Sequence, residues 1–544
     1  MIRRSFLKNA AAAGAAMAAI SQLPACDQPA ASISKKENDP FNDFDFLETT
    51  IADLQQLMVA GKLTAEALTQ AYLIRIEAID KNGPGINSVI EINPEALTMA
   101  RTLDEERKTG KVRSSLHGIP ILIKDNIDTA DQMETTAGAL ALQGNKAAKD
   151  ATIVRQLREA GAVLLGKTNL SEWANFRSTQ SCSGWSSRGG QTKNPYVLAY
   201  NPCGSSSGSG AAVAANLCAV AVGTETDGSV TCPASANGLV GIKPTVGLCS
   251  RAGIIPISAT QDTAGPLART VKDAALLLSF MAGPDEQDAI TLKNPQPNLV
   301  EKFLQDLNEK GLQGRRIGID VSRRSKYYQL NNLLEGALAV LKQQGATVIE
   351  VEYLAAIDKL GAFELEILQH EFKEGVNQYL RQAKAKVKSL EEVIAFNKAN
   401  EAQAMPYFKQ EQLEACAKKG DLNSATYKEA LLKGRDGCRS ILDTVMARHN
   451  LDALCGITMG PACSIDPVYG DRYSDDFLTS PAAIAGYPHI SVPCGLMAEL
   501  PVGFSLFAGP WQEDKLIKMA YAFEQATKAR TLPKYLTGFG VAAS

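Results

Sequence analysis

Serine hydroxyls are the side chains of this sequence that point most directly to chemistry. Ser205, Ser206 and Ser207 are consecutive in "NPCGSSSGSGAA", and Ser229 follows a glycine in "VGTETDGSVTCPAS". A serine hydroxyl is a weak nucleophile at neutral pH and needs a neighbouring base. Because the chain has only four histidines, lysine is the natural substitute, provided that burial lowers its pKa and leaves it neutral. The sequence therefore predicts a serine nucleophile with a lysine base.

Three lysines lie at the end of an apolar run, where burial would lower the pKa of the amine. They are Lys124 in "GIPILIKDNID", Lys167 in "AVLLGKTN" and Lys243 in "LVGIKPT". Since the three contexts are alike, the pattern alone does not rank them.

The serine-rich stretch itself has two other interpretations. "GSSSG" fits the G-x-S-x-G motif, which would make Ser206 the nucleophile of an α/β-hydrolase, with His489 as the one histidine at a strand edge. Pro202 weakens this hypothesis, because it interrupts the strand that the motif requires. Alternatively, the loop leads into a helix and could bind an anion, but neither glycine-rich phosphate-binding pattern is present.

The turn before Ser229 offers a second kind of group. Gly228 lets the chain turn sharply after the strand, so that successive backbone N–H groups can converge on one point, as in an oxyanion hole. The alternative is an ordinary turn serine that is hydrogen-bonded to its own backbone.

The elements that must position these residues are short apolar runs alternating with helical patterns. Runs that end in glycine or polar residues are typical of buried strands, and their reactive loops lie at the carboxyl ends. The predicted strands cover 118–125, 162–169, 218–228, 315–320, 346–354, 451–459, 489–496 and 502–509. Helices are predicted over 151–161, 270–283, 330–345 and 513–529, and after Thr64 as N-cap.

The fold class that follows is α/β: a single large domain over 45–544, with a central mostly parallel or mixed sheet covered by helices on both faces. Residues about 355–448 are charged, helix-periodic and poor in glycine, so we expect a helical insertion there. The chain has 544 residues and a net charge of -3. That charge gives no case for a nucleic-acid partner.

The N-terminus has the layout of an export signal. Residues 1–26 carry an arginine pair, an Ala-rich apolar run and a small-residue site, which resembles a twin-arginine signal peptide. "LPAC" also resembles a lipoprotein cleavage site, with Cys26 as a potential lipid anchor, and residues 27–44 form a polar tether. We therefore expect an exported, periplasmic protein with no membrane span once the signal is removed.

Several blocks of the sequence together resemble the amidase-signature family over roughly residues 45–535. In chain order they are "LHGIPILIKDNID", "NPCGSSSGSGAAVAA", "GTETDGSVTCPASANGLVGIKPTVG", "DTAGPLARTVKDAA", "AGYPHISVPCG" and "LPVGFSLFAGPWQEDKL". The resemblance implies a Ser-Ser-Lys triad that needs no metal or cofactor. Lys124 would be the base, Ser205 the bridging serine after a cis peptide bond, and Ser229 the nucleophile. The implied oxyanion-hole amides are those of Thr226, Asp227, Gly228 and Ser229.

Lys167 and Lys243 would then have structural roles. Four positions depart from the usual family pattern and resemble the bacterial peptide amidases: Ser207, Glu225, Asp227 and Thr231. Asp227 could bind the amide nitrogen or simply shape the turn. Substrate contacts are expected from 169–185 and from the insertion.

The function implied by the resemblance is hydrolysis of an amide through an acyl-enzyme. Its substrate would be a C-terminally amidated peptide or a related carboxamide, with release of ammonia. Two alternatives remain: hydrolysis of other small, aryl or acyl amides, and a non-catalytic periplasmic binding protein on the same scaffold.

Overall fold

An eleven-stranded sheet runs through the computed structural model, which describes residues 41, 43–296, 298–322 and 324–539. Phe44–Ser544 forms one compact unit. The signal peptide and Cys26 lie outside the described residues, as does nearly all of the tether. The order of strands across the sheet is β1 (Val89–Ile92), β3 (Val163–Thr168), β2 (Pro120–Lys124), β6 (Val220–Glu225), β8 (Thr263–Ala268), β7 (Val240–Lys243), β12 (His489–Met497), β13 (Leu500–Phe507), β11 (Ala453–Ile457), β9 (Arg316–Asp320) and β10 (Thr347–Val351).

The sheet is mixed, which is one of the two arrangements that the sequence predicts, and its centre is antiparallel. Strands β3, β2 and β6 are parallel, as are β11, β9 and β10, whereas the strands between them pair antiparallel. A tight hairpin is one reason. Ala498 and Glu499, both with positive φ, join β12 to β13, and such a two-residue turn can only connect antiparallel strands.

Every apolar run that the sequence predicts as a strand is a strand in the structure. β2, β3 and β6 are buried at every position, as expected for strands covered by helices on both faces. A small separate sheet pairs β4 (Trp185–Ser186) with β5 (Gly190–Gln191).

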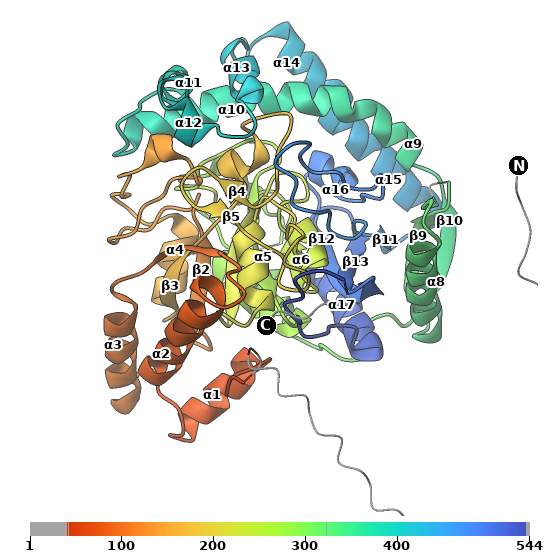
Figure 1. Ribbon diagram of the computed structural model, residues 1–544. Helices are drawn as coiled ribbons and strands as arrows, with labels where there is room; N and C mark the ends of the chain where they lie inside the picture. The colour runs from red at the N-terminus through yellow and green to blue at the C-terminus, as the bar shows by residue number, and fades with distance from the viewer. Residues whose placement is uncertain (1–40, 42, 297, 323, 540–544) are drawn as a thin grey trace, which may run out of the picture. The chain divides into compact units, whose positions relative to one another are not determined.

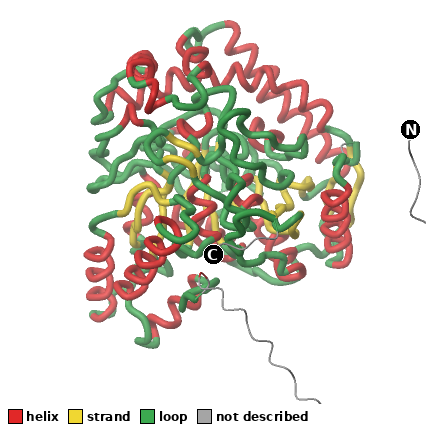
Figure 2. The backbone as a smooth tube through the Cα atoms, in the orientation of Figure 1, coloured by secondary structure: helices red, strands yellow, loops and turns green. Residues whose placement is uncertain are grey.

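Helices cover both faces of the sheet (Figure 1). Thr64 caps α2 and Thr270 caps α7, as predicted, each accepting a hydrogen bond from a first-turn amide. The helices outside the insertion are α1 (Ile51–Val59), α2 (Ala65–Arg75), α3 (Ala96–Lys108), α4 (Thr152–Glu159), α5 (Ser207–Ala214), α6 (Thr231–Ala236), α7 (Val271–Met281), α8 (Tyr328–Gln343), α16 (Ser480–Ala485) and α17 (Glu513–Thr527). Loops and turns fill much of the centre of the view (Figure 2).

The predicted insertion is helical and lies along one side of the domain, at the top of Figure 1. Its helices are α9 (Leu354–Ile357), α10 (Gly361–Gln382), α11 (Leu390–Ala399), α12 (Glu401–Ala404), α13 (Glu411–Ala417), α14 (Ala425–Ala430) and α15 (Gly437–His449). Phe372 of α10 packs against Trp173 and Phe176, with ring centroids 6.1 and 5.1 Å away. The apolar face of the insertion is therefore buried against the segment 169–185.

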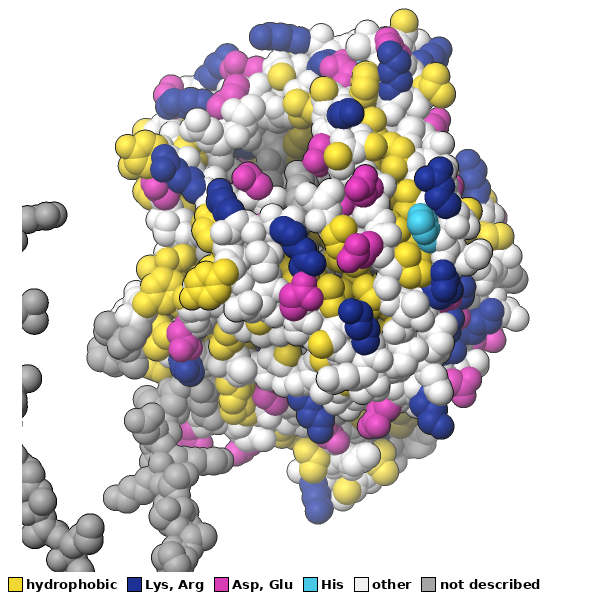
Figure 3. Space-filling view, turned by 90° about the vertical axis from the view of Figure 1, so that its right-hand side faces the viewer, with side chains coloured by type: hydrophobic (Ala, Val, Ile, Leu, Met, Phe, Trp, Pro, Cys, Tyr) yellow, Lys and Arg dark blue, Asp and Glu magenta, His cyan; other side chains and the backbone are white. Residues whose placement is uncertain are grey.

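The surface carries charges of both signs. On the face in Figure 3, Lys and Arg side chains lie among Asp and Glu side chains. Within the described part of the chain, no helix combines the length and apolar character that crossing a bilayer requires.

Candidate active site

Lys124 ends the buried strand β2, and its amine reaches the serine-rich loop. Nζ donates a hydrogen bond to Oγ of Ser205 or accepts one from it, at 2.7 Å. It also contacts Thr224 of the neighbouring strand β6, at 2.9 Å from Oγ1 and 3.2 Å from the carbonyl oxygen. Lys124 and Ser205 are both wholly closed to solvent. Of the three candidate lysines, this one contacts a candidate serine.

The pKa of Lys124 is lowered to about 7, because burial disfavours the charged amine more than the negative charges of Asp262 and Glu225 favour it. At neutral pH a large fraction of Lys124 is therefore unprotonated. A neutral amine has one lone pair and two N–H groups. Since the Thr224 carbonyl can only accept, the lone pair is left for a hydroxyl proton such as that of Ser205.

The serine-rich loop joins the lysine to the turn at Ser229. The expected cis peptide bond is present between Gly204 and Ser205. The amide of Ser206 donates to the carbonyl oxygen of Ser229 at 3.1 Å, which holds the two loops side by side. No hydrogen bond connects the hydroxyls of Ser205 and Ser229 in the described structure.

Ser206 is engaged in backbone contacts and not with a histidine. Its Oγ donates to the carbonyl oxygen of Thr224 at 3.1 Å and accepts from the Thr224 amide at 3.2 Å. His489 contacts Oγ of Ser505, and burial, helped by the nearby charge of Lys243, lowers its pKa to about 3. These contacts are against an α/β-hydrolase pairing of Ser206 with His489.

The turn before Ser229 presents unpaired amides. Gly228 has φ +79°, and a Cβ added there would lie 2.9 Å from Sγ of Cys232. Ser229 keeps 7% of its surface exposed, and its Oγ makes no hydrogen bond within the described chain. Among the described residues, no acceptor is bonded to the backbone N–H groups of 226–229. Such preorganised donors beside a hydroxyl can stabilise an oxyanion.

Glu225 and Thr231, two of the four positions that depart from the usual family pattern, are hydrogen-bonded to each other. The Glu225 carboxylate accepts from the amides of Val230 and Thr231, both at 2.8 Å, and from the Thr231 hydroxyl. It thus satisfies free donors at the start of α6, directly after Ser229. Burial raises the pKa of Glu225, and the charge of Lys243 opposes that shift.

The other two candidate lysines contact backbone carbonyls instead of the reactive serines. Lys167 donates to the carbonyl oxygen of Ile127 at 2.6 Å and to Oγ1 of Thr135 at 3.0 Å. Lys243 donates to the carbonyl oxygen of Pro244 at 3.2 Å. Their contacts fit the structural roles that the family resemblance implies.

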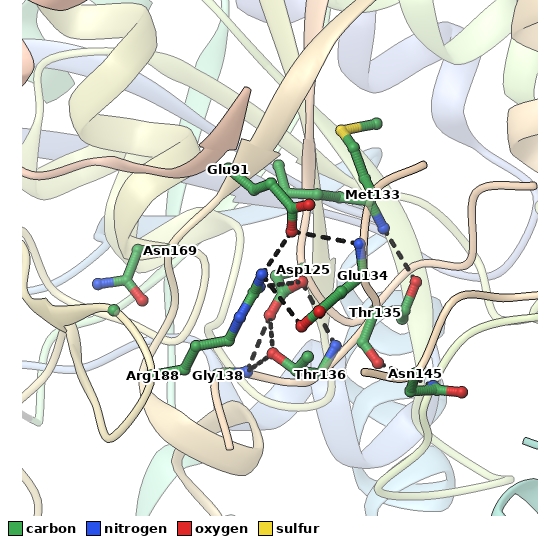
Figure 4. Close-up of polar contacts among 12 residues, drawn as sticks. Glu91, Asp125, Met133, Glu134, Thr135, Thr136, Gly138, Asn145, Asn169 and Arg188 are labelled. Atoms are coloured by element: carbon green, nitrogen blue, oxygen red, sulfur yellow. Dashed lines mark hydrogen bonds and ion pairs between the residues drawn. The ribbon is translucent and has the colours of Figure 1, made fainter. Parts of the chain in front are cut away.

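A buried ion network fixes the chain immediately after Lys124 (Figure 4). Asp125 accepts hydrogen bonds from the Thr136 hydroxyl and from the amide of Gly138. Arg188 lies between three carboxylates, those of Asp125, Glu91 and Glu134. The network holds the end of β2 and so the direction in which Lys124 points.

The segment 169–185 lies against the serine-rich loop. The amide of Ser171 donates to the carbonyl oxygen of Ser205 at 3.1 Å. Trp173, Ala174 and Asn175 all have positive φ, a conformation that costs energy for residues with a side chain and is found at functional sites.

A cavity of about 560 Å³ lies between α10 and the segment 251–262. Its lining includes Glu371, Tyr379 and Asp262, and Asp262 accepts a hydrogen bond from the Thr226 hydroxyl at 2.5 Å. Sequence reasoning missed Thr224, Asp262 and this cavity, because no local pattern distinguishes such residues from ordinary strand and loop positions.

The fold and the site define an α/β enzyme whose buried lysine–serine contact lies at strand ends. The family described as amidase matches residues 67–517 of the chain. A probable amidase of Arabidopsis thaliana is 42% identical over 504 residues, covering 91% of this chain and 93% of the plant protein. The X-ray structure of native peptide amidase from Stenotrophomonas maltophilia is 48% identical, with a TM-score of 0.85, and covers 90% of this chain and 99% of that one.

A further peptide amidase structure, in complex with the competitive inhibitor chymostatin, is 49% identical with a TM-score of 0.86, over 90% of this chain and 100% of that one. The chain belongs to the amidase family, and it is an amide-hydrolysing enzyme.

Proposed function

We propose that the enzyme hydrolyses amides through an acyl-enzyme on Ser229. Neutral Lys124 takes the proton of Ser205 while Ser205 takes the proton of Ser229. Oγ of Ser229 then bonds to the amide carbon, and the carbonyl π electrons move to oxygen. The amides of 226–229 stabilise that oxyanion, each such donor contributing about 3–4 kcal/mol.

The second half of the cycle returns the proton. It passes through Ser205 to the amide nitrogen, the C–N bond breaks, and ammonia leaves. Water, deprotonated along the same path, attacks the acyl ester, and Ser229 regains its proton as the carboxylic acid departs. The observation that carries this mechanism is the 2.7 Å contact between Lys124 and Ser205, closed to solvent.

The substrates that we propose are C-terminally amidated peptides or related carboxamides. The likeness to peptide amidases supports this class. Hydrolysis of other small, aryl or acyl amides is the alternative. A non-catalytic binding role has no support.

The deciding experiment is ammonia release from peptide amides, aliphatic amides and aryl amides by the wild type and by Ser229→Ala. We expect preferential turnover of peptide amides and its loss in Ser229→Ala. If Ser206→Ala abolishes turnover while Ser229→Ala does not, the mechanism is wrong. Faster turnover of aryl amides would overturn the substrate class alone.

We also propose that residues 1–26 direct export to the periplasm and that Cys26 can carry a lipid. The arginine pair and the "LPAC" sequence support this proposal. Fractionation of cells that express the full chain tests it. Replacing Arg3 and Arg4 by Lys should leave the protein in the cytoplasm, and Cys26→Ser should release it from the membrane fraction.

A further inference from the structure

The helical insertion reaches the turn before Ser229 through Glu364, in the first turn of α10. Oε1 of Glu364 accepts a hydrogen bond from Nε2 of Gln261 at 2.9 Å, and the same Nε2 lies 3.3 Å from the carbonyl oxygen of Thr226. The Glu364 carboxyl group also lies within hydrogen-bonding reach of the Asp227 carboxyl group. Two consecutive residues of the turn are thus connected to α10.

The two carboxyl groups can satisfy each other only with a proton between them. Oδ2 of Asp227 accepts from the Ser480 hydroxyl at 2.6 Å. Oδ1 is buried and makes no hydrogen bond among the described residues, although the Thr479 hydroxyl also lies near this carboxyl group. A second carboxylate offers it no hydrogen, whereas a protonated carboxyl group does.

The surrounding charges and hydrogen bonds favour the proton on Glu364. Burial, and then the negative charge of Asp227, raise the pKa of Glu364 to about 8. Burial also raises the pKa of Asp227, but the hydroxyls of Ser480 and Thr479 and the charge of Lys243 oppose that shift. A carboxyl group whose pKa is raised in this way is mostly protonated at neutral pH and can donate to a neighbouring carboxylate.

We propose that Glu364 is a positioning residue, whose protonated carboxyl group donates a hydrogen bond to Asp227 and holds the amides of 226–229 in their oxyanion-binding arrangement. This inference rests on the proposed function, which assigns those amides their role. When Glu364 loses its proton, two adjacent carboxylates repel each other, and the turn separates from α10. Through the protonated Glu364, the helical insertion contributes directly to the geometry of the reaction site.

Other titratable groups surround the pair on the elements packed against it. They are Glu225 of β6, Cys232 of α6, Lys243 of β7 and Cys438 of α15. Lys433 lies over the ring of Phe363, the residue before Glu364, and pairs with Glu429. Burial lowers the pKa of Lys243 to about 8 despite the nearby carboxylates, so it titrates in the same range as Glu364. A variant of Glu364 alone keeps all of these groups and isolates the contribution of the pair.

Glu364→Gln tests the proposal, because its amide is a permanent donor to Asp227 and its oxygen can still accept from Gln261. The measurement is kcat/KM for ammonia release between pH 7 and 10. With the pKa of Lys124 at about 7 and that of Glu364 at about 8, kcat/KM of the wild type should peak between these values and fall on the order of 10-fold or more by pH 9.5. Glu364→Gln should lack that fall, and Glu364→Ala should be impaired at every pH.

The matched control is Glu366→Gln, on the same helix, where Glu366 pairs with Lys419. It should keep the wild-type profile. If Glu364→Gln retains the alkaline fall, or if the control also loses it, the inference is wrong.

A second measurement does not depend on catalysis. A raised pKa in the folded protein means that the free energy of unfolding decreases as pH rises between 4.5 and about 8. Glu364→Gln should remove that part of the decrease, and an unchanged pH dependence would contradict the pair. If Ser229→Ala stays active, the proposed function fails while this measurement still decides whether the pair shares a proton.

Discussion

Nζ of Lys124 lies 2.7 Å from Oγ of Ser205, and both side chains are closed to solvent. The contact joins the end of a core strand to a loop that follows 81 residues later. It places a basic amine of lowered pKa against a hydroxyl whose neighbour, Ser206, is bonded to the carbonyl of Ser229.

Activity should depend on the unprotonated form of Lys124. Because its pKa is lowered to about 7, kcat/KM should rise with pH through about 7 and pass through a maximum before the alkaline fall attributed to Glu364. The measurement is a pH profile of ammonia release from a peptide amide whose own groups do not titrate in this range. If kcat/KM instead rises only near pH 10, the amine of Lys124 is solvated and its pKa is not lowered.

Lys124→Met should remove the basic amine while a side chain of similar volume still fills the buried site. We expect kcat to fall about 10²–10⁴-fold, with no loss of thermal stability, because an apolar side chain replaces a buried amine. Circular dichroism melting provides the check on folding. A variant that melts at the wild-type temperature and remains fully active would refute the assignment.

Gly228→Ala should harm both stability and activity. The backbone at Gly228 is left-handed, and the added Cβ would lie 2.9 Å from Sγ of Cys232. The strain of such a conformation is about 1–3 kcal/mol, and relief of the clash would displace the amides beside it. Denaturant unfolding measures the first effect and kcat the second. Gly314→Ala is the control, because its φ is +73° but no atom lies within 4 Å of the added Cβ.

Thr231→Val should measure the contribution of the hydrogen bond between Thr231 and Glu225 to stability. The change is close to isosteric and removes the hydroxyl that donates to the buried Glu225 carboxylate. A hydrogen bond to a charged group contributes about 1.5–3 kcal/mol, so the free energy of unfolding should fall by about that amount. Two backbone amides still bond to Glu225, and a loss well above 3 kcal/mol would mean that the carboxylate has moved.

Phe372→Ala should loosen the insertion from the segment 169–185. The ring is buried against Trp173 and Phe176, and truncation of a buried phenylalanine costs about 3–5 kcal/mol. We expect a lower unfolding midpoint together with a raised KM, because the insertion borders the 560 Å³ cavity. An unchanged KM with reduced stability would separate the insertion from substrate binding.

Much of the fold could be predicted from the sequence, because buried parallel strands such as β2 and β3 contain short runs of large apolar residues, 121–123 and 163–165. The sequence did not single out β8, since Gly265 and Pro266 interrupt its apolar character. That omission matters, because β8 pairs antiparallel with β6 and turns the centre of the sheet from parallel to mixed. The local sequence pattern of a strand does not indicate which other strands it pairs with in the sheet.

The sequence by itself determined which residues could react: serines in two loops, a glycine turn, and lysines at the ends of apolar strands. Pattern left Lys124, Lys167 and Lys243 equal, and all three are buried. The resemblance to a family favoured Lys124, and only the tertiary structure showed which amine meets a serine. The order β3–β2–β6 brings the end of β2 beside Thr224 and the serine-rich loop. The approach of Glu364 to Asp227 was likewise decided by packing of the insertion, because contacts between distant segments depend on the arrangement of the whole chain.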